Sequence, residues 1–353
     1  MNKRYWTWRL GRFSFLLERR AMRVVVWLVA LVAVVFLVSA GTGSTLIAPW
    51  NVIKALFGQG SKGDHLVLYS FRLPRLVIGL LVGSSLAVSG AILQGMIRNP
   101  LASPDMLGVT GGATAAAVGF LAFFTREDLS YSLSVSIAWL PPAAFCGALL
   151  VGLAVYALAW KRGITPLRLV LIGIGVAAGM SSLTTMLLVK SPSVYAANEA
   201  YIWMTGSIYS STWTKVRLLL PWTAVLLPAA FLLARRLNVH RLGDDTAVSV
   251  GGALERERLW MLLVSIGLAG SAVAFAGGIG FVGLMAPHIA RRLVGGAHGG
   301  LLPASACIGA VLVMLADLLG RTAFPPFDVP CGVFIATVGA PYFIYLLYRN
   351  RHQ

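Results

Sequence analysis

The residues of this chain that could take part in chemistry are few and lie far apart in the sequence. Gly278, Gly280 and Gly283 form a G-x-G-x-x-G pattern. In dinucleotide-binding domains this pattern follows a strand and precedes an acidic residue about 20 positions further on, and this chain has neither. The three glycines therefore predict a tight turn between two apolar segments rather than a cofactor site.

His288 and the three cysteines offer no metal or redox chemistry either. His288 follows Pro287 and has no Cys, His or carboxylate at the spacing of metal ligands. The cysteines lie in or beside apolar segments without metal-binding spacing, so we expect buried small hydrophobic side chains at Cys146, Cys307 and Cys331. No cofactor and no metal are predicted.

The chain also lacks an energy source of its own. It has no G-x-x-x-x-G-K-[ST] phosphate loop, so ATP hydrolysis is not expected of it. Ion-driven carriers use several ionisable groups within the membrane, and Asp317 is the one charged side chain inside the apolar segments. For Asp317 we expect a structural role, hydrogen-bonded or protonated, near the outer half of its segment. Energy for any transport should come from another polypeptide.

Apolar segments account for most of the sequence and must position these residues. A helix needs about 20 apolar residues to cross a hydrocarbon core roughly 30 Å thick. The chain is 58% apolar, with a mean hydropathy of +0.81. We predict an all-α polytopic membrane protein with ten transmembrane helices, at residues 24–40, 76–97, 106–124, 135–160, 169–189, 218–234, 259–276, 281–293, 301–319 and 329–348.

The basic residues predict the orientation of the chain. If the N-terminus is cytoplasmic and the segments alternate, 20 Lys and Arg lie on the cytoplasmic side and 9 on the other. This bias places both termini in the cytoplasm, and it explains the net charge of +17 without nucleic acid as a partner. The expected parts are a basic cytoplasmic segment (1–23), a single transmembrane domain (24–348) and a cytoplasmic tail (349–353).

The cytoplasmic loop at about 235–258 has the pattern of a docking element. Asp244 and Asp245 would begin a short helix, where carboxylates suit the helix dipole, and Gly251 and Gly252 would end it. The apolar side chains between them would face either the membrane domain or a protein partner (Ala247, Val248 and Val250). The residues alone favour neither a partner site nor an ordinary surface helix.

Three stretches, taken together, carry a family likeness. They are Arg72-Leu-Pro-Arg75 leading to Arg98-Asn-Pro-Leu-Ala-Ser-Pro104, then the loop Leu242-Gly-Asp-Asp-Thr-Ala247, and last Gly278-Ile-Gly-Phe-Val-Gly283 with Pro287, Ala316-Asp317 and Gly339-Ala-Pro341. In this order they resemble the permease subunits of iron-siderophore and cobalamin ABC importers (type II ABC importers). Within that family the likeness points to ferric enterobactin-type permeases, through residues 160–165 and 171–175.

The resemblance implies a fold, partners and a location. Members of this family have ten membrane helices and pair as homodimers or heterodimers, with two ATPase subunits beneath and a substrate-binding protein outside. We therefore expect a type II ABC importer permease fold in the bacterial inner membrane and no enzyme activity. The expected partners are ABC ATPase subunits, a substrate-binding protein, a second permease subunit, a ferric-siderophore substrate and membrane lipid.

The resemblance also implies roles for two sets of residues. Arginines at the matching positions are proposed to meet glutamates of the binding protein, although simple anchoring of helix ends is the alternative (Arg72, Arg75 and Arg321). Two proline-containing segments, suited to stiff bends, are implied to form the cytoplasmic gate, which is compatible with plain helix-connecting turns (Asn99, Pro100, Leu101 and Thr165, Pro166, Leu167).

Two further sets concern coupling and the transport path. By resemblance, a loop inserts into a groove of the ATPase and couples ATP hydrolysis to transport (Leu242, Gly243, Asp244, Asp245, Thr246, Ala247 and Gly251). The fifth apolar segment offers hydroxyl groups that could line the translocation path, with helix packing equally open (Ser181, Ser182, Thr184 and Thr185).

Three alternatives to a ferric-siderophore permease stay open at this point. Haem and cobalamin are alternative substrates within the same family. A secondary transporter driven by an ion gradient is the alternative from another class, but it predicts intramembrane charges in several segments. An intramembrane enzyme would need a paired catalytic set within the bilayer, and none is visible. The chelate and the identity of the second permease are not determined by the sequence.

Overall fold

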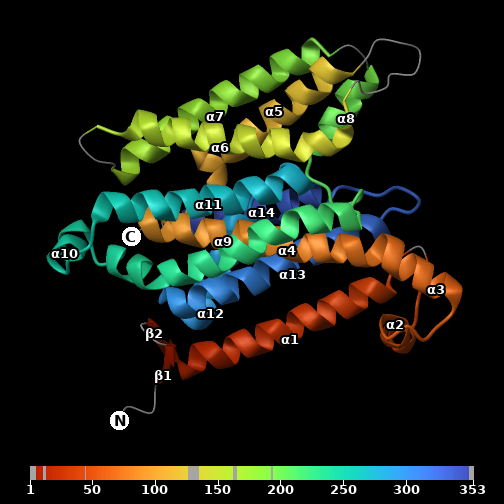
Figure 1. The fold of residues 1–353 in the computed structure, drawn as a ribbon, viewed down its shortest axis with the longest axis horizontal. Helices are drawn as coiled ribbons and strands as arrows, with labels where there is room; N and C mark the ends of the chain where they lie inside the picture. Colours follow the sequence, from red (N-terminus) through yellow and green to blue (C-terminus); the bar gives the residue numbers. More distant parts are fainter. Residues whose placement is uncertain are drawn as a thin grey trace.

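The molecule is built from long helices packed side by side, with one short hairpin at its N-terminal end (Figure 1). The structure is a computed structural model that describes residues 5–10, 13–43, 45–125, 135–161, 165–191 and 194–349. The antiparallel hairpin consists of β1 (Tyr5–Leu10) and β2 (Phe13–Glu18). Aromatic residues favour strands here. The other elements of the described residues are helices, in agreement with the predicted all-α class. Of the predicted tail 349–353, residues 350–353 lie outside the described residues.

Each of the ten predicted apolar segments coincides with a helix. The helices are α1 (Arg19–Gly41), α2 (Pro49–Leu56), α3 (Lys62–Leu66), α4 (Leu73–Ile97), α5 (Val109–Phe124), α6 (Leu140–Ala159), α7 (Pro166–Val189), α8 (Val194–Met204), α9 (Trp213–His240), α10 (Asp244–Ser249), α11 (Leu254–Ala276), α12 (Val282–Val294), α13 (His298–Thr322) and α14 (Cys331–Arg349). A π-helical turn, η1 (Val67–Arg72), joins α3 to α4, and two 3₁₀ turns are η2 (Pro104–Leu107) and η3 (Ile137–Trp139).

Seven helical stretches in the described residues are long and apolar enough to cross a membrane: Arg19–Gly41, Lys62–Ile97, Ile137–Ala159, Pro166–Val189, Trp213–His240, Leu254–Ala276 and His298–Thr322. Two shorter apolar helices cover Val109–Phe124 and Cys331–Leu346. The tenth predicted segment corresponds to α12, which has 13 residues. The chain is therefore a polytopic helical membrane protein.

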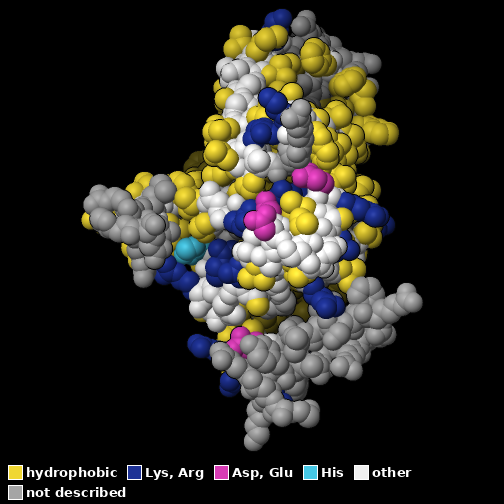
Figure 2. Space-filling model, turned by 90° about the vertical axis from the view of Figure 1, so that its left-hand side faces the viewer, with side chains coloured by type: hydrophobic (Ala, Val, Ile, Leu, Met, Phe, Trp, Pro, Cys, Tyr) yellow, Lys and Arg dark blue, Asp and Glu magenta, His cyan; other side chains and the backbone are white. Residues whose placement is uncertain are grey.

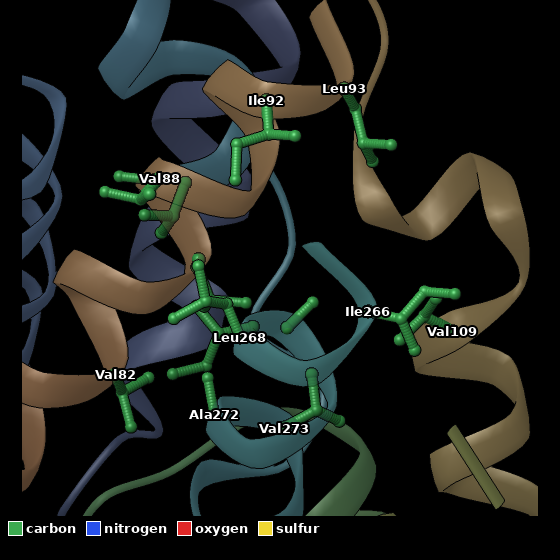
Figure 3. Packing of buried hydrophobic residues seen from close by; sticks show 14 of the residues in the cluster. Val82, Val88, Ile92, Leu93, Val109, Ile266, Leu268, Ala272 and Val273 are labelled. Carbon is green, nitrogen blue, oxygen red and sulfur yellow. The ribbon is translucent and has the colours of Figure 1, made fainter. Parts of the chain in front are cut away.

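Helix α4 lies at the centre of the bundle and is buried along most of its length. Figure 1 shows α5, α6 and α7 on one side of α11, and α1 beside α12 and α13 on the other. In the core, side chains of α4 such as Val82 and Val88 pack near Leu268, Ala272 and Val273 of α11 (Figure 3). The periphery, in contrast, presents apolar side chains outward, as expected of a surface that faces lipid.

Glycine pairs allow α4 to approach its neighbours closely. A Cβ atom added at Gly83 would lie 2.3 Å from the carbonyl oxygen of Gly309 in α13, and one at Gly90 would lie 1.8 Å from that of Gly283 in α12. Since lipid supplies little hydrophobic drive between helices, close backbone packing of this kind holds the bundle together.

The bundle has two distinct ends. One end carries α10, and we call it the α10 end; α1 begins there and α14 runs back toward it (Figure 1). The opposite end carries α2 and α3 and the loop between α13 and α14, and we call it the α2 end. The candidate functional residues divide between these two ends and the face of α7.

Candidate functional site

The predicted helix in the loop after α9 is present and is α10. Asp244 and Asp245 occupy its first turn, and Gly243 before it has a φ of 118° that favours glycine. The helix ends as predicted, because Gly251 has a φ of 82° and donates to the carbonyl of Val248. The sequence thus determines both ends of this six-residue helix.

The apolar residues of this loop point in two directions. Ala247 is buried, so it packs α10 against the rest of the chain. Leu242 is 72% exposed, Val248 57% and Val250 66%. These three side chains form an apolar surface at the α10 end, where basic side chains gather around acidic ones in Figure 2. This surface is suited to a protein partner rather than to water.

A carboxylate ties α10 to two other elements. Asp244 accepts hydrogen bonds from Arg258 Nη2 of α11 at 2.8 Å and from Arg98 Nη2 at the end of α4 at 2.8 Å. Close by, His240 Nε2 lies 3.0 Å from Glu257 Oε2. The sequence suggested Asp244 as a helix-terminal charge, but its two partners, 146 and 14 residues away along the chain, were missed.

The two predicted gate segments lie at the ends of α4 and α7. Asn99 Oδ1 accepts from the amide of Leu101 at 2.9 Å and forms a tight turn after α4. Thr165 is the N-cap of α7 and Pro166 is its first residue. Met96 and Ile97 of α4 share a small void with Pro166, so the structure brings the two helix ends together, although Asn99–Leu101 do not line that void. Their role as a gate stays a prediction.

A second acidic residue besides Asp317 lies among the membrane helices. Asp105 belongs to η2, where its Oδ1 accepts from Thr110 Oγ1 at 2.5 Å. The same turn passes so close to α7 that a Cβ at Gly173 would lie 2.1 Å from the carbonyl of Met106. Gly173 is seven residues into α7, roughly 10 Å along the helix. The prediction that Asp317 is the one charged side chain inside the apolar segments is therefore wrong. Asp105 was overlooked because the predicted segment 106–124 begins one residue after it.

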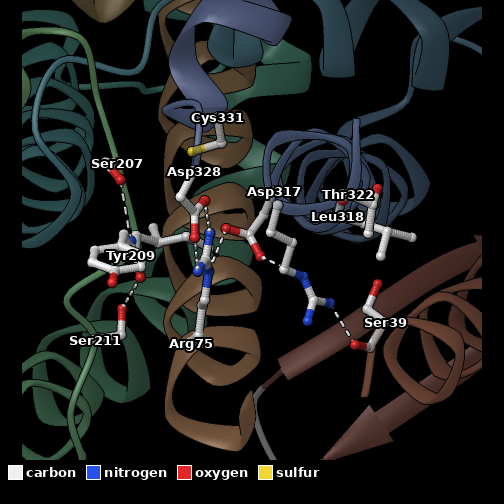
Figure 4. Close-up of polar contacts among 12 residues, drawn as sticks. Ser39, Arg75, Ser207, Tyr209, Ser211, Asp317, Leu318, Thr322, Asp328 and Cys331 are labelled. Atoms are coloured by element: carbon white, nitrogen blue, oxygen red, sulfur yellow. Dashed lines mark hydrogen bonds and ion pairs between the residues drawn. The ribbon is translucent and has the colours of Figure 1, made fainter. Parts of the chain in front are cut away.

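The three arginines predicted to dock a binding protein are found at the α2 end, with their guanidinium groups turned inward. Arg75 Nε donates to Asp317 Oδ1 at 2.7 Å, and Arg75 Nη1 and Nη2 donate to the two oxygens of Asp328 at 2.9 Å each (Figure 4). Arg72 donates to the carbonyl of Ala40 at 2.7 Å and to that of Thr45. Arg321 donates to the carbonyl of Ser39. Docking by these groups stays a prediction.

Asp317 is hydrogen-bonded, as expected, and a purely structural role for it stays a prediction. Its side chain is 1% exposed and is hydrogen-bonded to Arg75, and its second oxygen lies 3.7 Å from Arg321 Nε. The Arg75 guanidinium also lies 5.3 Å from the ring centre of Tyr209 (Figure 4). Asp328 and Tyr209 were not predicted, since nothing in their local sequence marks them as partners.

The hydroxyl residues of α7 do not form one surface. Thr184 is buried and donates to the carbonyl of Met180 at 2.8 Å. Ser181, Ser182 and Thr185 are exposed, and the last two donate to carbonyls of their own helix. The exposed face of α7 continues through glycines that have no atom within 4 Å of an added Cβ (Gly175 and Gly179). Lining of a path by these side chains stays a prediction.

No group of three His, Cys, Asp or Glu side chains in the described ranges is placed to hold a metal ion. The arrangement offers two charged clusters, one at each end of a membrane-crossing bundle, and an unpartnered face along α7.

Comparison with known proteins gives one consistent result. The FecCD transport family matches residues 31–349. The chain is 52% identical over 336 residues to "Probable siderophore transport system permease protein YfhA" of Bacillus subtilis (strain 168), covering 95% of this chain and 97% of that protein. It is 38% identical over 336 residues to the ferric enterobactin transport system permease protein FepG of Escherichia coli (strain K12), covering 95% and 98%.

A solved structure shows the same fold. This chain superposes with a TM-score of 0.82 and 28% identity on a candidate metal-chelate type ABC transporter in an inward-facing conformation, covering 93% of this chain and 99% of that one. The predicted likeness to iron-siderophore permeases is confirmed. The ferric enterobactin permease protein FepG is among these relatives.

Proposed function

This chain belongs to the FecCD transport family, and from that premise we infer that it is the membrane-spanning permease subunit of an ATP-driven importer of ferric siderophores. The observation that carries this conclusion is the family match over residues 31–349, together with relatives that are named as siderophore permeases along nearly their full length. The chain has no phosphate loop of its own, which agrees with a subunit that depends on a separate ATPase.

We propose ten membrane spans with both termini in the cytoplasm. The seven long apolar helices, the two shorter ones and α12 account for the ten. Basic residues are concentrated in the connections that this topology places inside. The α10 end is then cytoplasmic and the α2 end is extracytoplasmic.

The exposed surfaces suit three protein partners. The apolar surface of Leu242, Val248 and Val250 would contact an ATPase subunit. The α2 end would receive a substrate-binding protein. The exposed face of α7 would meet a second permease subunit, either a copy or a relative, with the transport path between them. Movement of α10 on ATP binding would shift the permease between outward- and inward-facing states, because ATP favours one arrangement of the ATPase pair.

The deciding experiment is transport by a purified complex. The tagged chain would be extracted in mild detergent from cells that also express an ABC ATPase and a binding protein, and reconstituted into vesicles. We expect labelled ferric siderophore to enter only when ATP and binding protein are supplied. Uptake driven by a proton or sodium gradient alone would overturn the proposal in favour of a secondary transporter. Uptake of haem or cobalamin, but of no ferric siderophore, would change the substrate while leaving the ATP-driven permease in place.

A further inference from the structure

Asp244 ties α10 to the membrane helices through two ion pairs. Within α10, Ala247 is the buried residue, so packing holds this short helix weakly. Asp244 instead binds two guanidinium groups, each through Nη2 at 2.8 Å, one from Arg98 and one from Arg258. Charge-assisted hydrogen bonds are stronger and more directional than neutral ones, so these bonds fix the position of α10 relative to both arginines.

Arg98 stands at the corner where the first gate segment leaves α4. It is the C-cap of α4, and its backbone is in the left-handed region with a φ of 58°. That conformation is uncommon for a residue other than glycine. The next residue is Asn99, which forms the turn of the gate segment. A displacement of Asp244 therefore acts directly on the residue that sets the direction of this segment.

Arg258 connects the same carboxylate to the second gate segment. Its side chain is 5% exposed, and it lines a small void together with Pro166 and Leu169 of α7 and Met96 and Ile97 of α4. Asp244 thus holds one arginine at the end of α4 and another that lies between the ends of α4 and α7. Its neighbour Asp245 is exposed.

We propose that Asp244 is the positioning residue that transmits movement of α10 to both gate segments, through Arg98 and Arg258. The inference rests on the proposed function, since it requires that an ATPase moves α10. Arg98 and Asp244 have side chains that are 36% and 35% exposed, so their ion pair is screened by solvent and contributes little to folding. Loss of this ion pair should therefore weaken the transmission of α10 movement to the gate segments and leave the folded protein intact.

The test is the number of substrate molecules transported per ATP hydrolysed by the reconstituted complex. Arg98→Gln should leave ATP hydrolysis close to the parental rate and lower this ratio by at least about fivefold, the lower limit of typical couplings between sites. Arg98→Lys, which keeps the positive charge, should restore most of the ratio. Arg292→Gln, an exposed arginine at the same end of the molecule, serves as the matched control and should keep the parental ratio.

A double variant separates the link from two independent effects. Asp244→Asn also removes a carboxylate from the buried Arg258, so it should lower the ratio further than Arg98→Gln. If Arg98 and Asp244 act through their shared contact, the double variant Arg98→Gln with Asp244→Asn should transport as many substrate molecules per ATP as Asp244→Asn alone. A parental ratio in Arg98→Gln, or additive losses in the double variant, would overturn the link while the importer assignment stands. A parental complex that moves no substrate on ATP hydrolysis would overturn the proposed function itself, and the link with it.

Discussion

Among single residues, Arg75 joins parts of the chain that are distant in sequence. Its guanidinium binds Asp317 of α13 and Asp328 of the loop before α14, and it lies near the ring of Tyr209. A buried charge is tolerated while its partner is present, and removing one partner leaves a charge that neither water nor protein compensates. Arg75 therefore holds the α2 end of the bundle together, whatever it also contributes to docking.

Replacing Arg75 tests this structural role. We expect Arg75→Gln to destabilise the protein by about 3–5 kcal/mol, the usual cost of breaking a buried pair. Asp328→Asn should cost less, because the Asp328 side chain is 27% exposed. Thermal unfolding of the detergent-extracted protein measures both effects. Arg217→Gln, which removes an exposed guanidinium, should leave the melting temperature unchanged.

The same variants decide between structure and docking. If Arg75→Gln melted like the parental protein but failed to capture the binding protein, the family-based docking role would be primary. The sequence suggested both Arg75 and Asp317 as important but could not pair them, because 242 residues separate them. The ion pair exists only through the crossing of α4 and α13, which no local pattern encodes.

At the scale of elements, the close crossings of α4 determine the geometry of the bundle. Gly83 and Gly309 exclude side chains from the crossing of α4 with α13, and the carbonyl of each lies where a Cβ on the other would be placed. Backbone atoms at such a crossing cannot rotate away as a flexible side chain can. Both glycines lie in predicted apolar segments, but nothing in the sequence pairs one with the other.

Alanine substitution should separate crowded glycines from free ones. We expect Gly83→Ala and Gly309→Ala each to destabilise the protein by about 1–3 kcal/mol, as overpacking does. Gly179→Ala should be neutral or slightly stabilising, because no atom lies within 4 Å of an added Cβ and alanine favours a helix. The comparison uses thermal unfolding in one detergent. Equal melting temperatures for all three variants would mean that the crossing adapts easily.

Helix α10 gives a second prediction at this scale. Val248 is exposed in the isolated chain, so Val248→Asp should fold normally while an aspartate replaces an apolar contact. We expect at least a tenfold loss of co-purifying ATPase, which corresponds to about 1.4 kcal/mol of binding free energy. Unchanged recovery of the ATPase would place its docking surface elsewhere. The control is an unchanged melting temperature of the purified variant.

Elements were predicted well where one physical rule dominates. Backbone groups in hydrocarbon must bond within their own helix, so a long apolar run predicts a helix, and each of the ten predicted runs coincides with one. Shorter features were missed, among them α8 and the hairpin β1–β2, since they are too short to give a span signal. Asp105 was missed for a related reason, because the turn that carries it re-enters the bundle instead of ending at its edge.

For the whole molecule, the position of the two charged clusters follows from the topology. The Arg98–Asp244–Arg258 cluster lies at the α10 end and the Arg75–Asp317–Asp328 cluster at the α2 end. The importer that we propose would respond to ATP on one side and to its loaded binding protein on the other. The two clusters lie one length of α4 apart, because this helix begins near Arg75 and ends just before Arg98.

Which end faces the cytoplasm can be tested by labelling single cysteines from outside. In a background with the exposed Cys146 replaced by alanine, Gln59→Cys marks the α2 end and Ser249→Cys marks α10. Because the basic residues favour a cytoplasmic α10 end, an impermeant maleimide should label Gln59→Cys in intact spheroplasts and Ser249→Cys only after permeabilisation. The reverse pattern would invert the orientation. Labelling of both from outside would contradict a bundle that places α2 and α10 on opposite sides, because a maleimide that cannot cross the membrane reaches only one of its faces.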